Sequence, residues 1–181
     1  MKRQVLGLKW ARRLDSKPSC IPNGRARGKK GLGIRYEKDL KQAYSAVLNQ
    51  NGVWFEFEDK NGHGYCQVDF LLEDTLRQSV FVIEAKHTWT EDGHVELEKL
   101  YLPVVKMALE ARNVSGIVVC KKLLPYMHGI EVVPTLAGAI SASGKGRTVW
   151  HWITTGVFPR PRKAAKRNGH NSPLAGASAT S

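Results

Sequence analysis

Residues 79–89 read SVFVIEAKHTW, an apolar run that ends where a glutamate and a lysine are separated by one alanine. Side chains alternate between the two faces of a strand, so Val80, Val82, Glu84 and Lys86 share one face. Both faces are apolar at the start of the run, which is typical of a central strand covered on each side. The stretch therefore predicts a buried strand from which Glu84 and Lys86 project together where it leaves the core.

The flanking residues predict an α/β sandwich with a mixed central sheet. Apolar residues recur at helical spacing from about 34 to 50, and Asn51-Gly52 is expected to end that helix. The alternating stretches VWFEFE and YCQVDFLLE predict two strands before residues 79–89. A helical pattern over 97–109, with Pro103 at a kink or near its start, precedes the apolar run GIVVCKK. This α-β-β-β-α-β order combines an antiparallel meander with a helical crossover, and RTVWHWITT predicts a final strand.

Composition separates both ends of the chain from this core. The stretch SKPSCIPNGRARGKKGLG and residues 158–181 combine Gly, Pro and cations with little apolar content. We therefore expect a basic arm at 1–33 and a basic flexible tail at 158–181 around a folded domain at 34–157. Residues 1–35 hold eleven Lys or Arg against one Asp, whereas 36–155 hold twelve basic and fifteen acidic residues. Basic ends act either as solvated, solubilising segments or as polyanion-binding arms, and we favour contact with nucleic acid.

Other features limit the class of protein. The sequence has no run of about 18 apolar residues, so we expect no membrane partner and no spanning segment. Three widely spaced cysteines without a C-x-x-C pair argue against a disulfide framework and a cysteine-based zinc site, and favour a reducing compartment. The first residues lack the apolar region of a secretory signal. We expect a cytoplasmic protein, or one in an intracellular host compartment if it is viral.

The predicted hairpin brings a second acid to Glu84 and Lys86. If the loop between the two strands is symmetric, the numbers of facing residues add to 153, which places Asp69 opposite Glu84. Two adjacent carboxylates repel each other unless something positive lies between them. A hard divalent cation such as Mg²⁺ meets that need with one or two carboxylates, water and substrate phosphate, and the lysine can stabilise developing charge. These groups suit hydrolysis of a phosphodiester.

With Asp69 on one strand and Glu84-Ala85-Lys86 on the next, the chain resembles the PD-(D/E)XK, restriction-endonuclease-like nuclease superfamily over roughly residues 34–122. The resemblance implies that Asp69, Glu84 and the Ala85 carbonyl bind Mg²⁺, with Mn²⁺ as a substitute, and that Lys86 assists the nucleophilic water. It also implies an acid in the first helix, for which Glu37 is the candidate and Asp39 the second choice. Gln67-Val68 replaces the proline of the family motif.

The function predicted in this way is a metal-dependent DNA endonuclease, with exonuclease activity as a variant and a preference for branched DNA or junctions as one form. The alternative is a non-catalytic nucleic-acid-binding protein of ribosomal-like or architectural type, in which Asp69, Glu84 and Lys86 form only structural pairs. A second E-x-K triplet, at 58–60, falls in a polar turn and is expected at the surface. Cutting both strands of a duplex would favour a homodimer. The residues expected to contact DNA are Arg25, Arg27, Lys29, Lys30, Arg35, Lys121 and Lys122.

Overall fold

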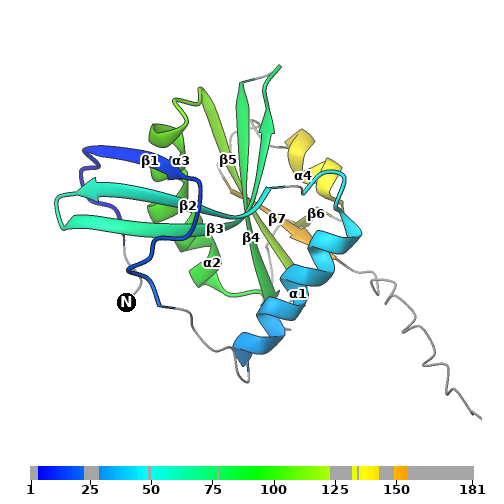
Figure 1. The fold of residues 1–181 in the computed structure, drawn as a ribbon. Coiled ribbons are helices and arrows are strands. Elements are labelled where there is room, and N and C mark those ends of the chain that lie inside the picture. The colour runs from blue at the N-terminus through cyan, green and yellow to red at the C-terminus, as the bar shows by residue number, and fades with distance from the viewer. Residues whose placement is uncertain are drawn as a thin grey trace, which may run out of the picture.

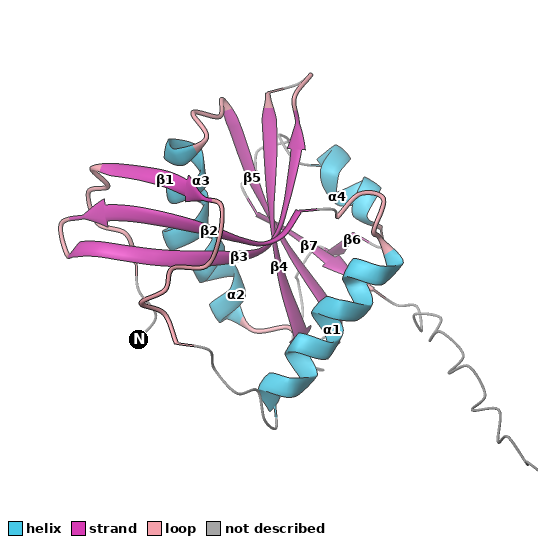
Figure 2. Ribbon diagram, in the orientation of Figure 1, coloured by secondary structure: helices cyan, strands magenta, loops and turns pink. Residues whose placement is uncertain are grey.

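The structure, a computed structural model, describes residues 4–22, 29–48, 50–76, 78–122, 132–133, 135–142 and 149–154. These residues form one mixed sheet with helices on both faces, shown in Figures 1 and 2. The predicted α/β class with a mixed central sheet is thereby confirmed. Within the described residues, no helix is long and apolar enough to cross a membrane.

Twelve elements make up the described part of the chain. They are β1 (Trp10–Leu14), α1 (Lys29–Ala43), β2 (Gln50–Asp59), β3 (Gly62–Asp74), β4 (Ser79–Thr88), α2 (Glu91–Glu96), η1 (Leu97–Tyr101), α3 (Leu102–Ala108), β5 (Asn113–Lys122), β6 (Val132–Val133), α4 (Leu136–Ala142) and β7 (Val149–Ile153). The seven strands lie in the order β1-β2-β3-β4-β5-β7-β6. The pairs β1–β2, β2–β3 and β3–β4 are antiparallel, and the pairs β4–β5, β5–β7 and β7–β6 are parallel.

Strand β4, which contains the Glu84-Ala85-Lys86 triplet, lies in the middle of the sheet. Its antiparallel pairing with β3 runs from Asp74–Ser79 to Phe70–Ile83, so facing residue numbers add to 153 as predicted. On its other side β4 pairs in parallel with β5, after the helical crossover formed by α2, η1 and α3. The predicted meander and crossover are therefore both present.

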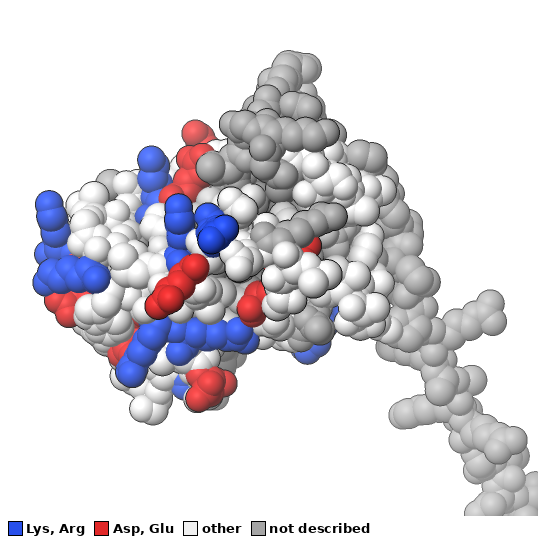
Figure 3. All heavy atoms as spheres, turned by 90° about the horizontal axis from the view of Figure 1, so that it is seen from above, with Lys and Arg blue, Asp and Glu red and all other residues white. Residues whose placement is uncertain are grey.

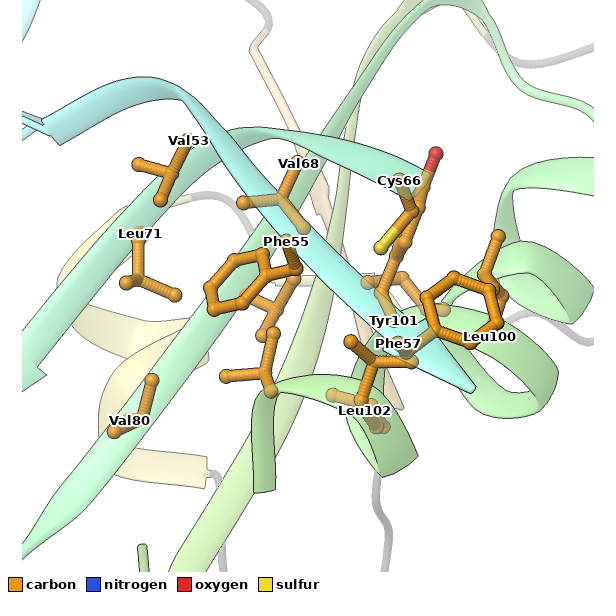
Figure 4. Close-up of a cluster of buried hydrophobic side chains, with 14 of the residues drawn as sticks. Val53, Phe55, Phe57, Cys66, Val68, Leu71, Val80, Leu100, Tyr101 and Leu102 are labelled. Carbon is orange, nitrogen blue, oxygen red and sulfur yellow. The ribbon is translucent and has the colours of Figure 1, made fainter. Parts of the chain in front are cut away.

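Two apolar cores cover the two faces of the sheet. The first packs β2 and β3 against η1 and α3, and Figure 4 shows its rings and branched chains meeting between these elements. The second packs α1 and α4 against the opposite face. In β4 the alternation predicted from the sequence holds: Val80 and Val82 enter the first core, whereas Phe81, Ile83 and Ala85 enter the second.

Strand β3 breaks this alternation at Asp69. Val68 lies in the first core, yet Phe70, two residues later, lies in the second. The β2–β3 ladder pairs Val53 with Val68 and Asn51 with Phe70, and is interrupted between them at Gly52 and Asp69. Gly52 has φ +63°, a conformation that glycine adopts without steric cost. Beyond the break β3 stays paired with β2 only at Phe70 and Leu71, and it continues beside β4, as Figure 1 shows.

The first helix starts and ends earlier than predicted. It begins at Lys29 and ends at Ala43, whereas apolar spacing indicated 34 to 50. Its first turn is basic and glycine-containing, so its helical period carries no apolar signal. After Ala43 the chain forms turns that end when Leu48 donates its N–H to the Tyr44 carbonyl. Asn51 and Gly52, expected to end the helix, instead lie in β2, where the positive φ of Gly52 coincides with the gap in the β2–β3 ladder.

The segment predicted as a basic arm contains an edge strand. Residues 10–14 pair antiparallel with β2 from Trp10–Glu58 to Leu14–Trp54, so the expected boundary at residue 33 is wrong for this part. The reason is charge pairing with acids distant in sequence. Lys9, Arg12 and Arg13 contact three glutamates of β2 and β3, which are Glu58, Glu56 and Glu73 respectively. The predicted tail at 158–181 lies outside the described residues.

The second E-x-K triplet is only partly the surface turn that was expected: Lys60 is exposed in the turn and Glu58 is half-buried. Asp59 is fully buried at the end of β2. Its carboxylate accepts the N–H of Asn61 at 2.9 Å and the N–H of Leu6 at 3.2 Å. It therefore closes the β2–β3 hairpin and attaches the residues that precede β1.

Pro103 lies near the start of a helix, which is one of the two positions predicted for it. It is in the first turn of α3, directly after the π-helical turn η1.

Candidate active site

Asp69 and Glu84 come together because the break in β3 lies beside the end of the β3–β4 ladder. The Ala85 N–H donates a hydrogen bond to Asp69 Oδ2 at 2.8 Å. Asp69 is thereby fixed against the backbone of the E-x-K triplet, one residue from Glu84. The predicted convergence of two acids and one lysine is present in the structure, and it depends on a specific backbone contact between β3 and β4.

Lys86 completes the group from the same face of β4 as Glu84. Its Nζ donates to Glu84 Oε1, and also contacts Glu96 Oε2 on α2 at 3.3 Å. Burial alone would lower the pKa of Lys86, but the charges of Glu84 and Glu96 raise it well above its ordinary value. The lysine is therefore a permanent cation between β4 and α2.

The negative charges of Asp69 and Glu84 are not fully balanced by nearby positive charge. Glu84 is only 4% exposed, and its Oε2 atom is buried without a hydrogen-bond partner among the described residues. Burial, reinforced by the charge of Asp69, raises the pKa of Glu84 to about 8 even though Lys86 opposes the rise. Burial and the charge of Glu37 raise the pKa of Asp69 to about 7, against the opposing Ala85 N–H. One ammonium is thus too little positive charge for the pair near neutral pH.

Glu37 lies on α1 across an open cleft from the β4 residues. The cleft has a volume of about 650 Å³ and is lined by the first half of α1 and the last residues of β4, including Glu37, Ala85, Lys86 and His87. Burial and the charge of Glu84 raise the pKa of Glu37. The structure therefore brings the predicted first-helix acid to the same site. Asp39 is not among the described residues that line the cleft.

The donor set fits a hard divalent cation better than a softer metal. Asp69 and Glu84 offer carboxylate oxygens, and Ala85 offers a backbone carbonyl in the same triplet. When both acids are ionised, the buried Oε2 atom of Glu84 has no hydrogen-bond partner among the described residues. Within the described part of the chain, no three His, Cys, Asp or Glu side chains group as metal ligands. Any cation here would thus rely on two acids, the carbonyl, water and substrate oxygens.

The residues expected to bind DNA divide into two groups. Lys121 and Lys122 end β5 beside the end of β4, where Thr88 pairs with Lys122. After burial, the charges of Lys121 and Lys122 lower the pKa of His87, which lines the cleft. Arg35 is exposed on α1. The other group is not placed by the structure: Arg25 and Arg27 lie outside the described residues, and so do the side chains of Lys29 and Lys30.

The described part of the chain is nearly neutral. It contains 16 Lys or Arg and 15 Asp or Glu, out of 28 and 16 in the chain, so 11 of the 12 excess positive charges lie outside it. In the view of Figure 3 the cations and acids of the described residues are interspersed rather than gathered by sign. Attraction for a polyanion must come mainly from residues beyond the described ones.

Sequence reasoning missed Glu96 and Gly93, both on α2. Gly93 is buried, and a Cβ built there would lie 3.1 Å from Lys86 Cε. A glycine in a six-residue helix, three positions before a glutamate, was the available signal, because residues three apart lie on one helix face. This signal can be interpreted only when it is known that this helix face contacts Lys86.

Searches for similar proteins found no matching family model, no matching curated protein and no matching solved structure.

Proposed function

We propose that this chain is a metal-dependent nuclease of the restriction-endonuclease-like type, which hydrolyses phosphodiester bonds in DNA. The observation that carries the proposal is the buried Asp69–Glu84 pair, with Glu84 Oε2 unpartnered and Lys86 beside it at the end of a central strand. A protein that only bound phosphate would gain nothing from uncompensated carboxylates at the contact surface. Their burial raises both pKa values, and such shifts concentrate at functional sites.

The chain's own residues divide the work as follows. Asp69, Glu84 and the Ala85 carbonyl would hold Mg²⁺ or Mn²⁺, which supplies polarisation of the scissile phosphate and an activated water. Lys86 keeps its proton and offers positive charge where the attacking oxygen and the phosphorane oxygens develop negative charge. Glu37, across the cleft, can orient water by accepting a hydrogen bond.

The open cleft allows a phosphodiester backbone to reach these groups from outside. The basic residues at both ends of the chain would supply binding without sequence specificity, through counterion release. A preference for branched or junction DNA and a homodimer able to cut two strands belong to the same proposal. We also propose that the protein works in the cytoplasm, or in the corresponding host compartment if it is viral.

The decisive experiment is a cleavage panel with single-stranded, duplex, flap and four-way-junction DNA, each with Mg²⁺, Mn²⁺, Ca²⁺ or excess chelator. We expect cleavage with Mg²⁺ or Mn²⁺, and binding with little cleavage in Ca²⁺. Full activity in excess chelator would remove the metal from the mechanism. Tight binding to all substrates without cleavage under any condition would instead support the non-catalytic alternative. Adding matched RNA substrates would define the nucleic acid accepted.

A further inference from the structure

The Lys86 side chain is held on more than one side. Its Nζ contacts Glu84 Oε1 on its own strand and Glu96 Oε2, 3.3 Å away, on α2. The lysine side chain is 22% exposed and that of Glu96 is 15% exposed, so their contact is largely shielded from water. A shielded ion pair keeps a long side chain in one geometry better than a fully exposed pair does.

The surface of α2 is shaped for this lysine. Gly93 and Glu96 are three residues apart and share one face of the helix. A Cβ at Gly93 would lie 3.1 Å from Lys86 Cε and 3.2 Å from Lys86 Cγ, which is closer than an ordinary contact. The absence of a side chain at Gly93 therefore leaves room for the lysine stem, and Glu96 meets the ammonium at its end.

Glu96 and Glu84 both contact Lys86, but only Glu84 is proposed to bind the metal. Under the proposed function, Glu84 must turn its carboxylate to the metal, and Lys86 then shares its partner with a divalent cation. Glu96 does not join Asp69 and Glu84 in a three-acid ligand group among the described residues. It can therefore continue to hold the lysine while Glu84 is engaged.

We propose that Glu96 is a positioning residue for Lys86, which holds the ammonium at the reacting phosphate after Glu84 has bound the metal. This inference rests on the proposed nuclease function for its catalytic part. The contact between Glu96 and Lys86 can be measured without any cleavage. Displacing a catalytic group by about 1 Å can cost up to about 100-fold in rate, so loss of Glu96 should be visible in turnover.

The test compares Glu96→Gln and Glu96→Asp with Glu98→Gln. Glu98 is two residues further along and pairs with His94 at 3.3 Å, so Glu98→Gln removes the same charge from a different ion pair. Glu96→Gln should lower kcat by about 10- to 100-fold with KM and Tm little changed, because substrate binding and packing are retained. Glu96→Asp should recover part of the rate, and Glu98→Gln should remain within about twofold of wild type.

The independent readout is the side-chain ammonium signal of Lys86 in ¹⁵N-labelled, metal-free protein that carries Glu84→Gln, which removes the competing carboxylate contact, and the signal is assigned by its loss in Lys86→Arg. In this background we expect a slowly exchanging signal that is kept when Glu98→Gln is added and lost when Glu96→Gln is added. A signal that survives unchanged in Glu96→Gln, or wild-type turnover in that variant, would overturn the positioning role. If wild type cleaves none of the substrates, the nuclease proposal fails, and the ammonium signal still decides whether Glu96 holds Lys86.

Discussion

Gly52 faces Asp69 across the gap in the β2–β3 ladder. The pairs on either side of the gap are Asn51–Phe70 and Val53–Val68, so the interruption coincides with the acid that the Ala85 N–H fixes. Positive φ at Gly52 allows β2 to accommodate the change of direction in β3. The position of a candidate metal ligand thus depends on a glycine in a neighbouring strand.

Gly52→Ala should therefore affect both stability and cleavage. A Cβ there would lie 2.9 Å from Gln67 Nε2, and the left-handed conformation costs an alanine about 1–2 kcal/mol. The matched control is Gly62→Ala, which has φ +96° but nothing within 4 Å of the new Cβ, at the far end of the hairpin. Both variants should lower the urea midpoint, and only Gly52→Ala should also lower kcat. An equal loss of activity in both variants would show that Gly52 has no specific role in positioning Asp69.

Glu84→Ala and Lys86→Ala should abolish cleavage while DNA binding is retained, because these residues act at the scissile phosphate. Asp69→Asn should do the same, and Glu37→Gln should reduce the rate less, since Glu37 reaches the site only across the cleft. Cleavage rates and DNA affinity in Ca²⁺ are the measurements, with circular dichroism to confirm folding. Wild-type cleavage by Glu84→Ala or Lys86→Ala would contradict the assignment. Loss of activity through unfolding would support a purely structural role.

The raised pKa values of the two acids predict an unusual pH dependence of stability. Burial raises the pKa values of the Asp69–Glu84 pair in the folded protein, whereas each acid loses its proton near its ordinary pKa when unfolded. The folded state then binds more protons, so the free energy of unfolding falls as pH rises from about 4 to 8. Asp69→Asn should remove part of this loss and stabilise the metal-free protein at pH 8 by about 1–3 kcal/mol.

Metal binding provides the complementary measurement. Mg²⁺ or Ca²⁺ requires ionised carboxylates, so binding at pH 7 should release protons. Calorimetry in buffers of different ionisation enthalpy reports that release, and urea unfolding with and without metal reports the restored stability at pH 8. A flat stability profile, or metal binding without proton release, would contradict the raised pKa values of Asp69 and Glu84.

Gly93→Ala tests the space left for the lysine stem. The new methyl group should push Lys86 aside, because its Cε and Cγ lie only 3.1 and 3.2 Å away, and kcat should fall while the fold remains. Gly31→Ala is the control, since nothing lies within 4 Å of its Cβ position in α1. There the better helix former should raise stability by up to about 1 kcal/mol. Unchanged turnover in Gly93→Ala would show that the stem has room elsewhere.

The basic segment before α1 should contribute to the salt dependence of DNA binding, but not through β1. Replacing Arg25 and Arg27 by alanine should lower the magnitude of the log K against log salt slope by about 1.8, if each neutralises one phosphate. The control, Lys9→Ala with Arg13→Ala, should leave the slope unchanged, because both cations already pair with glutamates. Equal slopes in both variants would assign the arm another role.

Deleting residues 1–30 would not answer this question. It removes β1 together with Val5, Leu8 and Ala11, which pack against the first core. We therefore expect the deletion to destabilise the fold, which would confuse loss of binding with loss of structure. A thermal unfolding measurement on the truncated chain checks this expectation.

The sequence predicted what depends on short-range pattern. The β3–β4 register followed from two apolar strands and a short polar loop, and it placed Asp69 beside Glu84. The strand VWHWI near the end of the described residues was also expected, and it forms β7. These features are encoded within about twenty residues of chain, where alternation and turn chemistry are sufficient.

The missed features depend on partners far away in sequence. Strand β1 and the residue before it carry three cations in the six residues from 9 to 14, so the local composition indicated an arm. Glutamates more than forty residues later convert that composition into an edge strand. Glu96 was overlooked for the same reason, because nothing near it in sequence indicates that α2 faces Lys86. Contacts of this kind have no periodic signal.

The pairing of β1 also has a consequence during synthesis. Trp10 leaves the ribosome 48 residues before its ladder partner Glu58, which at about 5–20 residues per second is a wait of roughly 2–10 seconds. A conventional apolar strand would be exposed to association with other nascent chains throughout that interval. The cations of residues 9–13 oppose such association, as charged residues do on natural sheet edges. These cations are neutralised only when the glutamates of β2 and β3 leave the ribosome. Strand β1 therefore becomes able to pair only when its partner strand has been synthesised.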